Sequence, residues 1–123
     1  NALVVGVEVD GQYKGYRLED IEKVGGVVND VLSGQPVVVI YDSMSQTGIA
    51  YSRLVDGQTL DFYNALIEGF ELRDRQTQTV WSHLGDGVSG QMEGQQVDFV
   101  PTFISEWYGW SAYHPDTELY LPR

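Results

Sequence analysis

The pair Asp-Gly, set between runs of β-branched and aromatic residues, constrains the fold of this chain more than any other local feature. It occurs at Asp10-Gly11, Asp56-Gly57 and Asp86-Gly87. Both residues tolerate the positive φ angles of a type I′ turn, so the pair closes tight hairpins between antiparallel strands. The first two pairs lie between clear strand-like runs, and the third lies in a Gly-rich stretch after Trp81. We therefore predict a mostly antiparallel β fold.

The segments between these turns carry their own patterns. The run from Pro36 to Tyr41 reads Pro-Val-Val-Val-Ile-Tyr, which predicts a central strand buried on both faces. The segment from Leu18 to Lys23 predicts a short helical turn, ended by Gly25-Gly26. The segment from Val27 to Leu32 fits a strand or a helix, and its pattern leaves both open.

The C-terminal region has a helical spacing of ring-bearing side chains. They are Phe103, Trp107, Trp110 and His114, at steps of four, three and four residues. This spacing places them on one side of a helix, with Thr102 as N-cap and Pro115 as stop. Residues Thr117 to Leu121 then read as a final strand. Together the patterns predict a mainly β (β-rich α+β) fold: a single antiparallel domain over residues 1–123, barrel-like or sandwich-like, with a short C-terminal helix.

Charge and cysteine content exclude several classes of protein. The chain carries 18 acidic and 7 basic side chains, a formal net charge of -11. Nucleic-acid binding needs clustered Lys and Arg, so that class is excluded, and an anionic membrane surface is disfavoured. The absence of cysteine excludes thiolate metal sites and Cys nucleophiles. No apolar run approaches the roughly 18 residues of a membrane-spanning helix, so we expect no direct membrane insertion by this segment.

Several short segments follow one another in the order found in a known family. They are Val4–Gly11, Tyr16–Leu18, Val28–Asp30, Gly34–Tyr41, Val55–Leu60, Asp74–Thr77, Val80–Ser82 and His114–Thr117. In this series the sequence resembles the domain-of-unknown-function 3179 family over nearly its whole length. The resemblance implies an extracytoplasmic protein (periplasmic, cell-surface or secreted). A chain that begins with Asn1 rather than Met agrees with a processed or excised product.

The sequence departs from the family pattern after the predicted central strand. The family typically has Tyr-Cys-Pro-Leu-Cys-Gly-Thr there, whereas residues 41–47 read Tyr-Asp-Ser-Met-Ser-Gln-Thr. Asp42 and Ser45 stand at the two cysteine positions, and neither supplies a thiolate. A histidine that the family often has before its Val-Asn-Asp segment is also missing, because Gly25 and Gly26 occupy that stretch.

This departing segment is the first candidate for a functional site. In one interpretation the side chains of Asp42, Ser43, Met44 and Ser45 line a pocket for a hard cation or a small polar ligand. In the other they form a turn whose Asp and Ser oxygens bond backbone N–H groups. The general role of these residue types favours the turn.

The two histidines are the next candidates. His83 and His114, with Asp116 and with Asp42 or Met44, have the donor atoms of a metal site. Such a site requires distant segments to converge. A helix C-terminus also favours a histidine for electrostatic reasons, which gives His114 a structural explanation. We therefore expect no cofactor, with a metal ion as the alternative.

Aromatic and serine side chains complete the candidates. Trp107 and Trp110 share the predicted helix face with Phe103, so we expect them to cover a sheet. Tyr108 lies off that face and is the better candidate for stacking on a ligand. No Gly-x-Ser-x-Gly elbow frames Ser43 or Ser45, so a serine hydrolase is disfavoured.

These observations favour an extracytoplasmic binding or structural module without catalysis. One alternative is a metal-binding protein or metal-dependent enzyme that uses His83 and His114 with carboxylates. A second is a secreted subunit that assembles through strand edges, with Ala2 to Val9 as the added strand. The partners expected are another protein, a second copy of the chain, or a small polar ligand.

Overall fold

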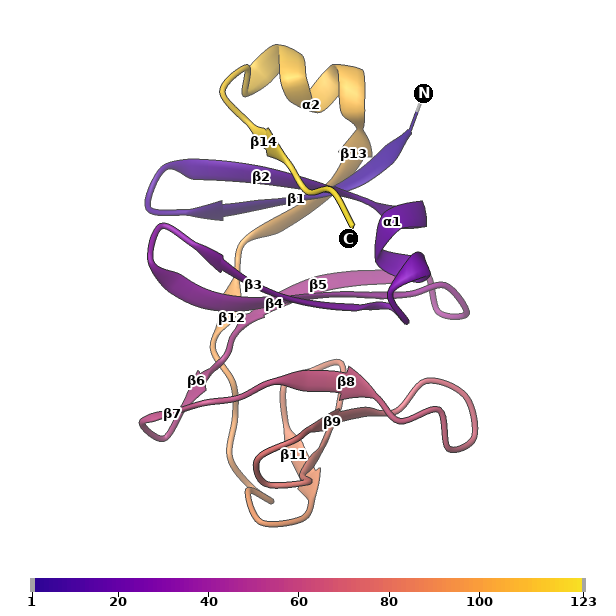
Figure 1. Ribbon diagram of the computed structural model, residues 1–123, viewed down its shortest axis with the longest axis vertical. Helices are drawn as coiled ribbons and strands as arrows, with labels where there is room; N and C mark the ends of the chain where they lie inside the picture. The colour runs from indigo at the N-terminus through magenta and orange to yellow at the C-terminus, as the bar shows by residue number, and fades with distance from the viewer. Residues whose placement is uncertain (1, 123) are drawn as a thin grey trace.

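Three four-stranded β-sheets lie one above another along the longest axis of the structure (Figure 1). It is a computed structural model and describes residues 2–122. The first sheet has the order β13 (Thr102–Glu106), β1 (Leu3–Val9), β2 (Gln12–Arg17), β14 (Glu118–Leu119). The middle sheet has the order β12 (Phe99–Val100), β5 (Thr47–Ser52), β4 (Gln35–Asp42), β3 (Val27–Leu32). The third has the order β11 (Gly87–Ser89), β10 (Val80–Trp81), β9 (Leu72–Asp74), β8 (Phe62–Asn64), and β6 (Leu54–Val55) pairs with β7 (Gln58–Thr59).

The mainly β, antiparallel fold predicted from the sequence is confirmed. Every strand pair within the three sheets is antiparallel except β14 with β2, which is parallel. The described sheets stack as layers and do not close into a barrel. Neither α1 (Leu18–Lys23) nor α2 (Trp107–Tyr113), the helices of the described residues, has the length and apolar character to cross a bilayer.

Strand β4 is apolar on both faces, as the sequence predicts. Val37 and Val39 join the core between the first and middle sheets, whereas Val38 and Ile40 join the core between the middle and third sheets. The first core also contains Val5, Val7 and Tyr16, and the second contains Phe62, Leu72 and Trp81. Because alternate side chains of a strand point to opposite faces, one strand contributes to two cores.

Two of the three Asp-Gly turns are confirmed. Asp10 and Gly11 have φ angles of 49° and 78°, and Asp56-Gly57 repeats the conformation between β6 and β7. The third prediction, at Asp86-Gly87, is wrong. The turn between β10 and β11 lies three residues earlier, at Ser82 to Gly85, with Gly85 at φ 80° and its N–H donating to the carbonyl of Ser82. Gly87 belongs to β11, where the backbone of Met92 approaches too closely for a side chain.

The short helix α1 is confirmed over its predicted range, and the ambiguous segment after it is strand β3. The C-terminal helix begins later than predicted: Thr102 and Phe103 belong to β13, and Glu106 is the N-cap. Residues 102–106 pair with β1, and this strand pairing overrides the helical spacing of the ring-bearing side chains.

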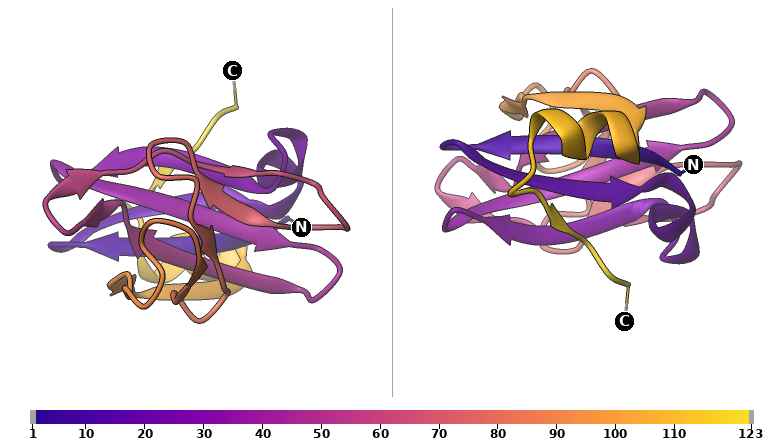
Figure 2. Two further views of the ribbon diagram at one scale, coloured as in Figure 1. Left: turned by 90° about the horizontal axis from the view of Figure 1, so that it is seen from below. Right: turned by 90° about the horizontal axis from the view of Figure 1, so that it is seen from above.

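Helix α2 covers the outer face of the first sheet (Figure 2). Trp110 lies over Gly6 and Trp107 lies over Gly15, where each glycine leaves room for the indole. The sheet-covering role expected of the two tryptophans is therefore confirmed. Strand β1 pairs with β13 on one side and β2 on the other, so Ala2 to Val9, expected as the strand added to another subunit, lies within a sheet of its own chain.

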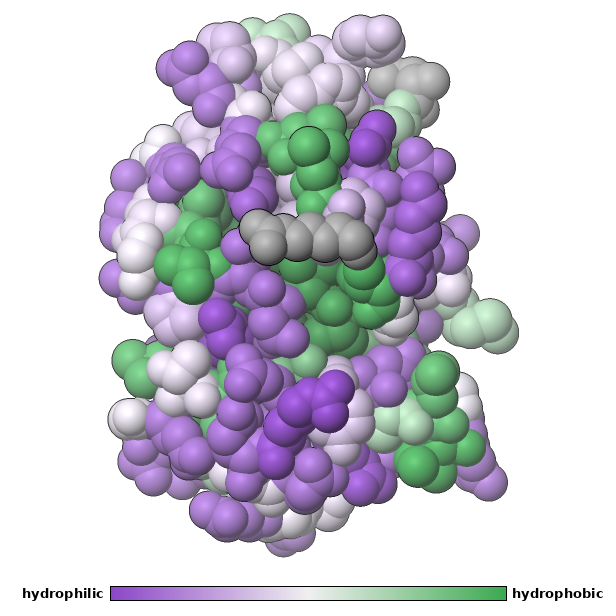
Figure 3. Space-filling model, viewed as in Figure 1, coloured by the Kyte–Doolittle hydropathy of each residue, from purple (hydrophilic) through white to green (hydrophobic). Residues whose placement is uncertain are grey.

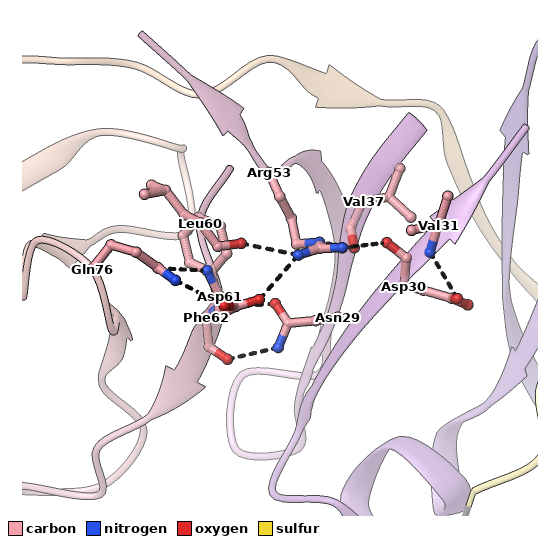
Figure 4. A network of polar contacts seen from close by, with 9 residues as sticks. All are labelled: Asn29, Asp30, Val31, Val37, Arg53, Leu60, Asp61, Phe62 and Gln76. Carbon is pink, nitrogen blue, oxygen red and sulfur yellow. Dashed lines mark hydrogen bonds and ion pairs between the residues drawn. The ribbon is translucent and has the colours of Figure 1, made fainter. Parts of the chain in front are cut away.

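A buried arginine joins several backbone segments beneath the middle sheet (Figure 4). The guanidinium of Arg53 donates to the carbonyl oxygens of Val37, Asp30 and Leu60, at 3.0, 2.9 and 3.2 Å. It also pairs with the Asp61 carboxylate at 3.1 Å. Because Arg presents its donors in a rigid fork, one side chain fixes β3, β4 and the chain that leads to β8.

Candidate functional site

The loop after β4 forms the turn that the sequence favours. Asp42 is buried, and its Oδ1 accepts a hydrogen bond of 3.1 Å from the N–H of Met44. The hydroxyl of Ser45 donates to that of Thr47 at 2.8 Å. Ser43 is exposed, and Met44 is 93% exposed. The short polar side chains therefore hold the turn together while the thioether points into solvent.

Asp42 also lies beside His83, which comes from the loop between β10 and β11. The distance from His83 Nε2 to Asp42 Oδ2 is 3.5 Å, and the His83 side chain is 35% exposed. The His83 and Phe70 rings meet at a steep angle, with 5.8 Å between their centroids. The structure thus brings together one residue from each of two candidate sites.

A buried tyrosine fixes the backbone under His83. The Tyr51 hydroxyl contacts the carbonyl oxygens of Ser82 and His83, at 3.1 and 2.8 Å. Burial raises the pKa of Tyr51, so the hydroxyl keeps its proton and remains a donor. The imidazole is therefore presented on an anchored loop.

Three loops lie beside one another around the Asp42–His83 pair: residues 42–46, 65–70 and 82–85. We call this region the loop end. Large apolar side chains on these loops are exposed to solvent, at 93%, 69%, 62% and 71% for Met44, Leu66, Ile67 and Leu84. Figure 3 shows apolar surface gathered over the β8–β9 loop, below the β4–β5 loop. Exposed apolar residues grouped on anchored loops are typical of interaction sites.

Two hollows adjoin the Asp42–His83 pair. One, of about 450 Å³, lies between the β8–β9 loop, Trp81 and His83. The other, of about 260 Å³, lies between Gly26, the Asp42 loop and Leu66. Phe70 lines both. The loop end therefore offers adjoining recesses bordered by apolar side chains.

The remaining predicted residues lie elsewhere. Helix α2 and strand β11 are at opposite ends of the long axis (Figure 1), so His114 is not brought to His83. The His114 ring stacks on Tyr13 at 4.0 Å between centroids and lies tilted against Trp110 at 4.5 Å. Asp116 is exposed two residues further on. Within residues 2–122, no group of three or more His, Cys, Asp or Glu side chains is arranged to hold a metal ion.

Tyr108 is 73% exposed, as the sequence predicts, and Tyr113 on the same helix is 85% exposed. Both lie on α2, apart from the loop end. Sequence reasoning missed Leu66, Ile67 and Leu84. The signal that marks Leu66 and Ile67 is a pair of large aliphatic residues in a segment with turn residues on both sides, Asn64 and Gly69.

Several residues in the segments that carry the family resemblance are structural. Asp74 is fully buried, and its carboxylate accepts hydrogen bonds from the backbone N–H and hydroxyl of Thr77 and from the indole N–H of Trp81. Thr117 likewise accepts from the Trp110 indole at 3.0 Å and donates to the His114 carbonyl. These polar residues hold turns and sheets in place, which leaves the loop end as the candidate for interaction.

Comparison with known protein families gives a match over almost the whole chain. The family model described as "Protein of unknown function (DUF3179)" matches residues 1–120. Neither the curated proteins nor the solved structures contain a significant match to the chain. Since the family model spans almost all of the chain, the protein belongs to the DUF3179 family of proteins of unknown function.

Proposed function

We propose that this protein is an extracytoplasmic, non-catalytic binding module that uses the loop end to bind a protein partner. The carrying observation is the convergence of three loops that expose Met44, Leu66, Ile67 and Leu84 around a buried carboxylate. Exposed apolar groups of this kind gain free energy when a partner removes them from water. The extracytoplasmic location rests on the family resemblance.

The charges around the loop end indicate what kind of partner fits. Glu68 and Glu71 line the larger hollow, and Glu22 and Asp42 line the smaller one. Arg73 neutralises Glu71 through an ion pair of 2.8 Å, but the surroundings stay acidic, as does the chain as a whole. A partner segment with apolar side chains next to Lys or Arg is complementary to this surface.

Selection from a displayed peptide library tests the proposal with a defined probe. We expect the purified protein to enrich peptides that combine apolar and basic residues. Titration calorimetry of a synthetic selected peptide should show affinity reduced about ten-fold in Leu66→Ser/Ile67→Ser. The matched control is Val31→Ser/Leu54→Ser, which changes two residues of similar character, 55% and 49% exposed, away from the loop end. Equal losses in both double variants would contradict the proposal, as would selected peptides without this composition.

The location is tested separately. Fractionation of cells that express the natural gene, followed by immunodetection, should find the protein outside the cytoplasm. Recovery in the cytoplasmic fraction alone would overturn this part of the proposal and leave the binding surface to be judged by the peptide experiment.

The alternative of a metal-binding protein has one observation in its favour. Asp42 Oδ2 and His83 Nε2 lie 3.5 Å apart. One oxygen and one nitrogen are thus close enough to bind the same metal ion. The test is elemental analysis of protein purified without chelator, with melting curves in EDTA, copper, zinc and calcium. A stoichiometric metal lost in His83→Ala but kept in His114→Ala would establish this function, and protein without metal or thermal shift would dismiss it.

A further inference from the structure

A third recess lies apart from the two at the loop end, between the edge strands of two sheets. Its volume is about 760 Å³, within the size range of small-molecule sites. Strand β3 of the middle sheet forms one wall, and β14 with residues 120–122 forms the other. We call it the β3–β14 cleft. Exposed apolar side chains, Val24 and Leu121, border part of the cleft, whereas Val27 and Val28 of β3 are buried and the rest of the lining is largely polar.

A group of charged side chains lies within this cleft. Lys14 Nζ is 2.9 Å from Asp30 Oδ2 and 3.4 Å from Glu118 Oε1. The hydroxyl of Tyr16 donates to Asp30 Oδ2 at 2.7 Å, and the Lys14 ammonium lies 5.9 Å from the centre of the Tyr120 ring. The side chains of Lys14 and Asp30 are 11% and 21% exposed, whereas that of Glu118 is 57% exposed. Glu118 is therefore the charged group that an incoming ligand meets.

The inner groups keep their ordinary charge states. Burial opposes the charged form of Lys14, but hydrogen bonds and charges from Asp30 and Glu118 outweigh it and raise the pKa of Lys14. Burial likewise favours protonated Asp30, but hydrogen bonds from Lys14 and Tyr16 outweigh it and lower the pKa of Asp30. Burial, with the hydrogen bond to Asp30, raises the pKa of Tyr16, so its hydroxyl stays neutral. The three charged groups therefore sum to a net negative charge near pH 7.

We propose that the β3–β14 cleft is a binding site for a small organic cation, an ammonium group on an apolar chain. The exposed side chains of Val24 and Leu121 would contact the hydrocarbon, and the exposed Glu118 carboxylate would bind the ammonium. An anion of the same shape would be repelled by the two carboxylates, Asp30 and Glu118, that already pair with Lys14. The cleft is thus complementary to a cation in both charge and polarity.

Three probes of nearly equal shape test the proposal: hexylammonium, hexan-1-ol and hexanoate. Each is titrated into ¹⁵N-labelled protein while backbone amide shifts are followed. We expect hexylammonium to shift amides of residues 27–30 and 118–121 and to bind about five-fold more tightly than hexanol, with hexanoate weakest. Equal affinity for the three probes, or shifts scattered over the molecule, would overturn the proposal.

Substitutions identify the groups responsible. Glu118→Gln should weaken hexylammonium about five-fold and leave hexanol unchanged. Glu93→Gln, which alters an exposed carboxylate outside the cleft, should change neither. Leu121→Ser, at a wall residue that is 66% exposed, should weaken hexylammonium and hexanol alike. Hexylammonium binding that survives Glu118→Gln unchanged would refute the assigned carboxylate. The probe series on the unaltered protein remains decisive even if a variant folds poorly.

Discussion

Asn29 and Asp30 are neighbours on β3 and reach in opposite directions to different sheets. The Asn29 side chain exchanges two hydrogen bonds with the backbone of Phe62 on β8, both at 2.9 Å. The Asp30 side chain instead contacts Lys14 and Tyr16 of β2 in the first sheet. Because successive residues of a strand face opposite sides, two adjacent polar residues connect the middle sheet to both of its neighbours.

The contact between Asn29 and Phe62 predicts a specific loss of stability. Asn29→Ala removes both hydrogen bonds and leaves polar backbone groups of a buried residue unpaired, which should cost about 2–3 kcal/mol of unfolding free energy. Urea denaturation measures the change. Gln58→Ala, an exposed substitution on β7, is the control. A loss for Asn29→Ala no larger than that of the control would show that the contact contributes little.

Asp30 predicts a pH dependence of stability. Its pKa in the folded protein lies below the ordinary value of 3.8, so above that value the carboxylate is ionised in both states and its stabilisation is fully present. As the pH falls from 3.8 towards the folded-state pKa, the unfolded chain takes up the proton first and the stabilisation is lost.

The measurement is the difference in unfolding free energy between the natural protein and Asp30→Asn, over about pH 7 to pH 2. We expect the difference to shrink as the solution is acidified. Asp56→Asn, in an exposed turn, corrects for the removal of one negative charge from an acidic chain. A difference that stays constant over the whole range would contradict the role given to Asp30.

Gly6 predicts how closely α2 packs on the first sheet. A Cβ at this position would lie within 2.7 Å of three atoms of the Trp110 ring, so Gly6→Ala should displace the helix and cost about 1–3 kcal/mol. Gly109→Ala on α2 is the matched control, because its Cβ would meet only the Ser105 hydroxyl at 3.6 Å. Helix propensity makes that change favourable by up to about 1 kcal/mol. Equal effects on denaturation curves and tryptophan fluorescence would disprove the close packing.

The acidic composition predicts stabilisation by salt. With a formal net charge of -11, repulsion among carboxylates opposes the compact state, and dissolved salt screens it. The melting temperature should therefore rise in graded NaCl. KCl should act equally, because screening does not depend on the identity of the monovalent cation. An unchanged or lower melting temperature would show that carboxylate repulsion does not limit stability.

The parts of the fold that the sequence predicts correctly are those specified by neighbouring residues. The turn at Asp10-Gly11 and the strand from Pro36 to Tyr41 depend on local conformational preference and a continuous apolar run. The start of α2 depends on pairing between β13 and β1, which come from opposite ends of the chain. Helical spacing within residues 102–114 carries no information about that pairing.

The candidate site was predictable only in part for the same reason. The residue types of Asp42 and His83 identify both as candidates, but their contact is a product of the fold. Lys14 and Glu118 form part of the β3–β14 cleft through parallel pairing of β14 with β2, and this arrangement has no local signature.

The placement of β4 between two cores has a consequence for the order of folding. Strands β3, β4 and β5 are consecutive in sequence and form three of the four strands of the middle sheet through two short hairpins, so loop-closure entropy opposes them least. The first sheet is complete only when β13 and β14 arrive from the C-terminal region. We therefore expect the β3–β5 meander to form first during synthesis on the ribosome, as a template with two apolar faces, and α2 to pack last on the first sheet.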